Sequence, residues 1–488
     1  MSLNLRWKVP VKAYQPFVRW WWFGGGLTKT EIDRELHLMD RANIGGVEIQ
    51  PIYSALKGSP LSEEKETLWL TDQWLDLVKF TVETAKKHDI QVDLTFGNGW
   101  PFGGPHITPE LASTKIQSFS MPIEGNELVE IPLEDLCDDI NMLVAVVAVQ
   151  DEGSKTDQRV DLTDKVTHDF ISWKTPSGKW NLHWYTMIPT GQKVKRATPG
   201  GEGLVLNHFN HQALDLHADK IGTALKSVFG SSLGNYFGAF FCDSWEVYGA
   251  DWTASFKQEF FNQMGYEIVP YMPLIFNPNI PLVHEKMTEE ERAVKYDYMR
   301  VRSEVILREF FTHFTSICHE FGVKSRVQPY SAPVDLLQAY GQVDTLEIEG
   351  FGRDGIKTLY YGSVDPRLAS SGAHMYGKKL VSCESFTWIG EHFSVSLETL
   401  KREADQIILH GINRIVYHGY PYSPKEAGVP GWVFYAAVCA NHNNTWFPYM
   451  HLINTYIARN SYLSQQGDAV VDFAVYLQIG RAACRERV

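Results

Sequence analysis

The chain of 488 residues is longer than one simple domain and suits a large barrel that carries an insertion. Its net charge of −13, without a basic run or stripe, argues against nucleic acid as a partner, and no stretch of 18 apolar residues predicts a membrane-spanning segment. Aromatic residues make up 13% of the chain, and they suit a large core as well as they suit platforms for sugar rings.

The first hundred residues alternate between predicted strands and helices. Short runs that are rich in β-branched or aromatic residues are typical of strands buried on both faces. Three such runs come first, at Phe17–Trp22, Gly46–Gln50 and Gln91–Phe96. Apolar positions at helical spacing predict helices over Thr28–Asn43 and Asp72–His88, and the pair Thr28 and Glu31 predicts a capping box at the start of the first helix.

From about residue 114 to 220 the pattern changes to short alternating runs separated by turns. The most regular runs are Asn141–Gln150, Gly178–Thr186, Gln192–Arg196 and Leu204–Asn207. The interval is much longer than an ordinary connection between a strand and the next helix. We therefore predict an inserted, β-sandwich-like domain between the third and fourth barrel strands.

The strand and helix alternation then resumes. Five further strand runs follow at Gly238–Cys242, Lys324–Gln328, Thr345–Glu349, Lys379–Cys383 and Arg414–His418. Predicted helices between them cover Thr253–Met264, Thr288–Phe321, which opens on a capping box of Thr288 and Glu291, and Val395–His410. After the last strand, Gly431–Ser464 has a helical, aromatic pattern. Eight strands with intervening helices predict an α/β fold of the (β/α)₈ TIM-barrel type.

The predicted division of the chain is 1–113 for barrel strands one to three, 114–225 for the insertion, and 226–430 for strands four to eight. Residues 431–478 would hold the helical segment and the start of a C-terminal β domain, because Ala469–Leu477 has a strand pattern. The last ten residues, 479–488, have no apolar period and resemble a translated sequencing adapter, so we expect them to lie outside the fold.

Cysteine usage and the N-terminus bear on the compartment. The six cysteines lack disulfide or metal spacing, and Cys242 and Cys383 lie in apolar runs where buried free thiols are expected. Met1–Pro10 has no apolar stretch of a secretion signal. Both features favour the cytoplasm for the chain as written, and a secreted or periplasmic location if the N-terminus is incomplete.

Polar side chains gather where the predicted barrel strands end, and barrel active sites lie at those ends. They are Glu48, Gln50, Asn98, Trp100, Asp243, Glu246, Arg326, Gln328, Tyr330, Glu347, Glu349, Glu384 and His418. Carboxylates crowd the ends of strands four, six and seven. Glycoside hydrolysis needs such a group, because one carboxyl must stay protonated while another stays ionised.

Plainer roles for these residues remain open. Any single glutamate at a strand end could be solvated or ion-paired, Asp243 could cap a helix, and His418 could be a buried barrel histidine. Glu347 and Glu349 are two residues apart, so on a regular strand they face the same way. Both could point into the barrel mouth, or one could support the other.

Seven segments carry a resemblance to a known family. They are Arg19–Trp22, Gly99–Pro105 with Thr108–Ser113, Asp243–Gly249, Ala332–Leu337, Glu347–Gly352, Cys383–Trp388 and Tyr417–Gly419. With these segments in order, the chain from about residue 16 to 477 resembles glycoside hydrolase family 106, the α-L-rhamnosidases. Family members generally carry further β-sandwich domains, which do not follow here.

The resemblance implies an inverting hydrolase that releases terminal α-L-rhamnose from plant or microbial polysaccharides or glycosides. By position, Glu246 and Glu384 match catalytic glutamates of the family, and Glu347 or Glu349 matches a third. We assign Glu246 as the general acid and Glu384 as the general base, although the two roles could be reversed. The expected substrate-binding residues are Trp100, Asp243, Arg326, Gln328, Trp388 and His418.

The resemblance also implies a calcium ion that helps to bind the sugar hydroxyls. Calcium prefers oxygen ligands. Glu48 and Asn98 are the first candidates, and Asp243 and Glu349 are also eligible. The sequence does not choose among them.

Two other functions stay open beside rhamnoside hydrolysis. The barrel could hydrolyse a different neutral or deoxy sugar, or it could be a non-catalytic carbohydrate-binding protein on a decayed barrel. A decayed barrel would typically have lost a strand-end carboxylate, and all are present here. In each case the expected partner is a carbohydrate, and the oligomeric state is left open.

Overall fold

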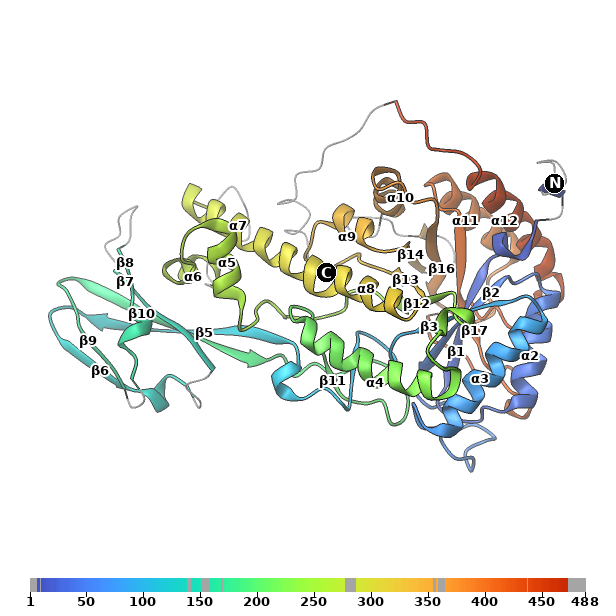
Figure 1. Ribbon diagram of the computed structural model, residues 1–488, viewed down its shortest axis with the longest axis horizontal. Coiled ribbons are helices and arrows are strands. Elements are labelled where there is room, and N and C mark those ends of the chain that lie inside the picture. Colours follow the sequence, from blue (N-terminus) through green and yellow to red (C-terminus); the bar gives the residue numbers. More distant parts are fainter. Residues whose placement is uncertain are drawn as a thin grey trace.

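A computed structural model describes residues 7–472 except for 9, 138–141, 151–157, 168–169, 277–286, 354–356, 359–364 and 437. Its centre is a closed ring of eight parallel strands (Figure 1). In ring order these are β1 (Phe17–Phe23), β2 (Gly46–Ile52), β3 (Gln91–Thr95), β12 (Ala239–Cys242), β13 (Lys324–Val327), β14 (Thr345–Arg353), β16 (Val381–Ile389) and β17 (Arg414–Pro421). Pairing of β17 with β1 closes the ring. The predicted barrel is confirmed.

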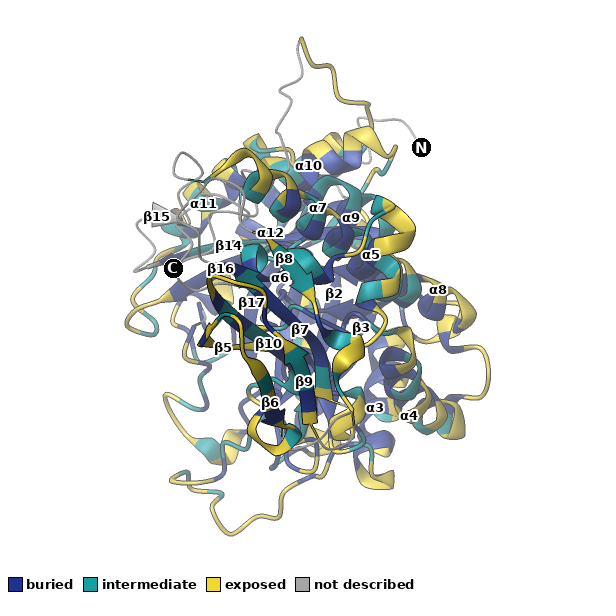
Figure 2. Ribbon diagram, turned by 90° about the vertical axis from the view of Figure 1, so that its left-hand side faces the viewer, coloured by how far each residue is buried: buried dark blue, intermediate teal, exposed yellow. Residues whose placement is uncertain are grey.

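The strands are continuous apolar runs because helices cover the outside of the ring and side chains fill its inside. Buried residues accordingly follow the barrel strands (Figure 2). Two strands differ most from the prediction. The run predicted at Lys379–Cys383 begins at Val381 and continues to Ile389, and β14 extends past Glu349 to Arg353, where the short β15 (Lys357–Thr358) pairs with it antiparallel.

The helices lie between the strands, although none was predicted at His211–Phe229, Met272–Ile275, Leu336–Gln342 or Pro366–Met375. They are α2 (Lys29–Arg41), α3 (Asp72–Lys87), α4 (His211–Phe229), α5 (Phe256–Met264), α6 (Met272–Ile275), α7 (Glu289–Ile306), α8 (His313–Glu320), α9 (Leu336–Gln342), α10 (Pro366–Met375), α11 (Leu397–Leu409) and α12 (Met450–Ser464). A π-helical turn, Leu307–Thr312, joins α7 to α8, so the long helical region predicted there is nearly continuous.

The two predicted capping boxes have different outcomes. At α7 the box of Thr288 and Glu291 is complete. At α2 only half of it forms. Thr28 accepts a hydrogen bond from the backbone of Glu31, but the Glu31 carboxylate accepts from the backbone N–H of Lys425 at 3.0 Å. The N–H of Thr28 donates instead to the hydroxyl of Tyr422, because the loop after β17 packs over the start of this helix.

The insertion projects from the barrel as an elongated β lobe (Figure 1). Its strands are β5 (Thr114–Glu124), β6 (Leu128–Pro132), β7 (Leu143–Gln150), β8 (Arg159–Asp161), β9 (Phe170–Lys174) and β10 (Lys179–Pro189). They form a four-stranded sheet in the order β5-β10-β7-β8 and a separate pair, β6-β9, around a small core of their own that includes Ile131, Ile171, Trp180 and Leu182. A sandwich-like classification of this lobe stays a prediction.

The last part of the interval 114–225 lies on the barrel. Helix α4 packs against α3 and α8. Of the run predicted at Leu204–Asn207, only Leu204–Val205 forms a strand, β11, which pairs with β4 (Gly103–Gly104) just after β3. Gln192–Arg196 forms isolated bridges instead of a strand, one of them between Lys195 and Trp100. This segment therefore lies over the end of β3.

The helix predicted over Gly431–Ser464 begins only at Met450. The described residues before Phe447 are irregular, because asparagine side chains there bind backbone carbonyls. Asn441 donates to the carbonyl of Pro421 at 2.9 Å, and Asn444 donates to that of Cys439 at 3.2 Å. Such bonds compete with the helical pattern.

The remaining expectations fall mostly at the C-terminal end. Residues 469–472 of the run predicted as a strand are irregular, and the rest of that run and the tail 479–488 lie outside the described residues. Cys242 and Cys383 are buried free thiols, as predicted. Among the helices that the structure describes, none is long and apolar enough to cross a membrane.

Candidate active site

A buried arginine organises the carboxylates inside the barrel. Arg19, in the middle of β1, is 1% exposed. Its guanidinium lies near four carboxylates: Glu48 at 2.9 Å, Glu384 at 2.9 Å, Asp243 at 3.3 Å and Glu347 at 3.9 Å. Burial alone would lower the pKa of Arg19, but these negative charges raise it well above its usual value. Arg19 is therefore a fixed positive charge at the centre of the site.

The sequence reasoning did not single out Arg19 as a site residue. The signal was a charged residue in the middle of an otherwise apolar strand, Phe17–Phe23. A charge buried on such a strand needs partners, since an isolated ion is costly to remove from water. Arg19 lies inside its strand and not at the C-terminal end, where barrel active-site residues are expected.

A second buried arginine forms a layer of charge with two glutamates. Arg326 contacts both Glu48 and Glu347, in the latter case at 2.7 Å, and is 1% exposed. Glu347 also accepts hydrogen bonds from Ser382 at 2.7 Å and from Gln328 at 3.0 Å, and it has no exposed surface. Glu347 and Arg326, expected to act on substrate, thus bind other barrel side chains and hold the interior together.

Glu384 is a buried carboxylate that the site keeps ionised. It accepts hydrogen bonds from Gln328 at 2.7 Å and Thr387 at 2.8 Å, besides its ion pair with Arg19. Burial alone would raise its pKa, but the charge of Arg19 and these hydrogen bonds lower the pKa of Glu384 to about 2. His418 lies 3.5 Å away, and burial lowers the pKa of its imidazole to about 4, so it is neutral at pH 7.

Two neighbouring acids are shifted in the opposite direction. Burial raises the pKa of Asp243 to about 7, against the effect of Arg19, and the charge of Glu384 adds to the rise. Burial and the charge of Glu384 also raise the pKa of Glu349 well above its usual value, although the Tyr330 hydroxyl donates a hydrogen bond to it. One ionised carboxylate thus lies among acids that favour their protonated forms.

Glu246 lies in the loop after β12 and is the more accessible of the two predicted catalytic glutamates. Its side chain is 29% exposed, against 4% for Glu384. Its carboxylate accepts hydrogen bonds from the Lys195 ammonium and, at 2.8 Å, from the Tyr248 hydroxyl. Lys195 also lies over the ring of Tyr248, 4.4 Å from its centre. Burial works against the charge on Lys195, but the bond to Glu246 raises the pKa of that ammonium.

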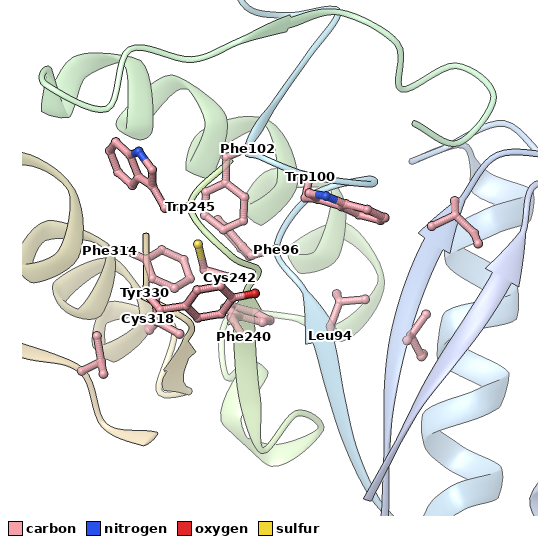
Figure 3. Close-up of a cluster of buried hydrophobic side chains, with 14 of the residues drawn as sticks. Leu94, Phe96, Trp100, Phe102, Phe240, Cys242, Trp245, Phe314, Cys318 and Tyr330 are labelled. Atoms are coloured by element: carbon pink, nitrogen blue, oxygen red, sulfur yellow. The ribbon is translucent and has the colours of Figure 1, made fainter. Parts of the chain in front are cut away.

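Aromatic side chains surround these acids. Trp100, Phe102 and Trp245 gather beyond the ends of β3 and β12 (Figure 3). They line a small pocket together with Asp243 and Gln328. Trp388, at the end of β16, is 4% exposed and packs edge-on against Phe386 at 5.5 Å. The structure thus brings together Trp100, Asp243 and Gln328 of the expected substrate-binding residues.

The residues expected to bind calcium do not form a complete site. Both oxygens of Glu48 are taken by guanidinium groups, so this carboxylate does not fit a calcium ligand. Asn98 is buried at 2% exposure, and its amide oxygen has no hydrogen-bond partner. Within the described residues, no three His, Cys, Asp or Glu side chains are grouped so that they could hold a metal.

Known proteins resemble this chain over most of its length. A Formosa agariphila protein named "Putative beta-glucuronidase" is 26% identical over 94% of the chain and 41% of its own length. A solved rhamnosidase from Novosphingobium sp. PP1Y superposes with a TM-score of 0.76 at 18% identity, over 96% of the chain and 61% of that structure. The chain therefore spans less than two thirds of the length of either relative. A family profile described as alpha-L-rhamnosidase matches residues 8–141 and 134–484. The chain belongs to glycoside hydrolase family 106, the α-L-rhamnosidase family.

Proposed function

We propose that this chain is the barrel portion of an inverting glycoside hydrolase that releases terminal α-L-rhamnose from polysaccharides or glycosides. One observation carries the proposal: Arg19 and the hydrogen bonds from Gln328 and Thr387 hold Glu384 ionised, with a pKa of about 2. Inverting cleavage of a glycoside requires one carboxylate that stays ionised to activate water and a second carboxyl group that donates a proton. Membership of the family favours rhamnose as the sugar.

In the proposed reaction Glu384 acts as the base and Glu246 as the acid. Glu384 removes a proton from a water molecule as the water oxygen attacks the anomeric carbon. The glycosidic bond breaks, and Glu246 donates its proton to the departing oxygen. Gln328 and Arg19 hold Glu384 in place, while Tyr248 positions Glu246. Inversion needs room for the water, which corresponds to a carboxyl separation of about 6.5–9.5 Å.

Substitution of Glu246 tests the assignment of the acid. In Glu246→Gln we expect kcat on an unactivated rhamnosyl disaccharide to fall by about 10²- to 10⁴-fold, because no proton reaches the departing oxygen. A nitrophenyl rhamnoside should lose much less, since nitrophenolate leaves without a proton. The measurement is kcat for both substrates. Equal losses on both would assign Glu246 to another role.

Calcium stays part of the proposal through the side-chain amide oxygen of Asn98, which is buried without a hydrogen-bond partner. If calcium helps to bind the sugar hydroxyls, a chelator should raise KM for an aryl α-L-rhamnoside, and added calcium should restore it. Isothermal titration of the metal-free protein with CaCl₂ checks binding separately from activity. An unchanged KM together with no heat of binding would remove calcium from the site.

The sugar itself is tested by a substrate panel. We expect release of free rhamnose from an aryl α-L-rhamnoside. The name of the Formosa relative makes an aryl β-D-glucuronide the natural comparison substrate. Faster cleavage of the glucuronide, or of another neutral or deoxy sugar, would replace rhamnose in the proposal. Binding of sugars by a folded protein that cleaves none of them would instead favour a non-catalytic role.

A further inference from the structure

The β lobe joins the barrel through a two-stranded stem (Figure 1). Its first strand, β5, begins at Thr114, and this residue pairs with Pro189, the last residue of β10. Hydrogen bonds continue the pairing beyond the two strands. The backbone N–H of Thr190 donates to the carbonyl of Ser113 at 2.8 Å, and the hydroxyls of these two residues lie 2.6 Å apart. The chain therefore enters and leaves the lobe at one place.

The entering strand of this stem binds the loop that carries Glu246, at the far end of that loop. The Thr114 hydroxyl donates to the carbonyl of Trp252 at 2.6 Å. The backbone N–H of Ile116 donates to the carboxylate of Asp251 at 2.8 Å, and the N–H of Asp251 donates to the carbonyl of Thr114 at 3.2 Å. These bonds hold the C-terminal end of the loop against β5.

The leaving strand is followed by Gln192, whose side chain binds the middle of the same loop. Its amide nitrogen donates to the carbonyl of Glu246 at 2.7 Å, and its amide oxygen accepts from the backbone N–H of Tyr248 at 2.7 Å. Gln192 is itself held in place, since its carbonyl accepts from the N–H of Val205 in β11 at 3.0 Å. One half-buried side chain thus satisfies two backbone groups of a loop that forms neither helix nor strand there.

The same segment holds Glu246 at two levels. Lys195 binds the carboxylate of Glu246 and also donates to the Tyr248 hydroxyl at 2.7 Å. The two bonds from Gln192 go to the backbone of the loop instead. A substitution at Gln192 therefore releases the backbone beside Glu246 and leaves the charges around its carboxylate as they are.

We propose that Gln192 is a positioning residue for proton donation: through it the stem of the β lobe holds the backbone of Glu246 where its carboxyl group meets the departing oxygen. The inference rests on the proposed function, in which Glu246 is the acid. A general acid must lie within hydrogen-bond reach of the atom that it protonates, and a displacement of about 1 Å can cost about 10²-fold in rate. Because the loop has no helical or sheet bonds of its own at Glu246, the lobe fixes that distance.

The test uses Gln192→Met, which keeps the length of the side chain and loses both hydrogen bonds. We expect kcat on an unactivated rhamnosyl disaccharide to fall by about 10- to 100-fold. A nitrophenyl rhamnoside should lose much less, because nitrophenolate leaves without a proton. In a Glu246→Gln background, Gln192→Met should cause no further loss on either substrate, since its effect passes through Glu246. The control is Gln258→Met, at an exposed glutamine of α5 that bonds Asn262 on the same helix at 2.8 Å.

The outcomes separate positioning from a general effect on the fold. An unchanged disaccharide rate, equal losses on both substrates, or a further loss in the Glu246→Gln background would overturn the inference while the proposed function stands. Gln192→Asn, with an amide that is one methylene shorter, should give the same pattern and serves as the test if Gln192→Met does not fold. If Glu246→Gln by itself slows both substrates equally, the proposed acid is wrong and the inference fails with it.

Discussion

Replacing Glu384 by glutamine should lower kcat by about 10²- to 10⁴-fold on every rhamnoside, including those with good leaving groups. The attacking water must lose its proton in each case, whatever group departs, and glutamine cannot accept that proton. Glutamine keeps the volume of Glu384 and can still accept a hydrogen bond from Gln328 or Thr387. The measurement is kcat on an aryl rhamnoside and on a disaccharide.

A structural effect of this substitution must be separated from a chemical one. Circular dichroism and the melting temperature of Glu384→Gln show whether the fold is retained, and Glu398→Gln, at a carboxylate that is 79% exposed on α11, is the control. A smaller variant, Glu384→Ala, leaves room for azide. Azide attack at the anomeric carbon without a base would give the rhamnosyl azide of inverted configuration. The mechanism itself is tested on the wild-type protein: free rhamnose of retained configuration, read by NMR before mutarotation, would contradict inversion.

The barrel could be predicted because each of its strands and helices is encoded by a short, continuous segment of the sequence. Each strand is a short apolar run bounded by turn residues, and each helix has apolar positions on one face, so the eight repeats are visible one at a time. The strand-end rule then selected Asp243, Glu349 and Glu384 without any knowledge of contacts, because the C-terminal ends of parallel strands meet at one end of the barrel.

What could not be predicted depends on contacts between distant segments. Nothing in the sequence around Gln192–Arg196 shows that it crosses the end of β3 and brings Lys195 to Glu246, 51 positions away. The strand predicted there did not form, because its backbone bonds are satisfied by isolated bridges to Trp100 and Leu204. Likewise, the layer of Arg326 and Glu347 is visible only once the strands are placed in a ring.

The second large effect concerns Arg19. In Arg19→Met we expect a loss of about 3–5 kcal/mol in the free energy of unfolding at pH 7, because several buried carboxylates lose a partner. The pKa of Glu384 should rise from about 2, since burial then acts without the opposing charge. The acidic limb of the kcat profile should therefore move to higher pH. Urea denaturation and the pH–rate profile measure the two effects.

The sign of the pH dependence separates electrostatics from simple loss of packing. The pKa of Glu384 in the folded wild-type protein lies below its usual value of 4.5, so this group stabilises the fold above that pH and the contribution is lost as pH falls toward 2. The difference in stability between wild-type protein and Arg19→Met should then be largest near neutral pH and shrink in acid. Arg19→Lys keeps the positive charge but lacks the planar guanidinium, so its stability should lie between those of the wild-type protein and Arg19→Met. It serves as the test if Arg19→Met does not fold. A stability difference that is the same at pH 3 and pH 7 would mean that Arg19 acts through packing, and that Glu384 does not depend on it for its charge.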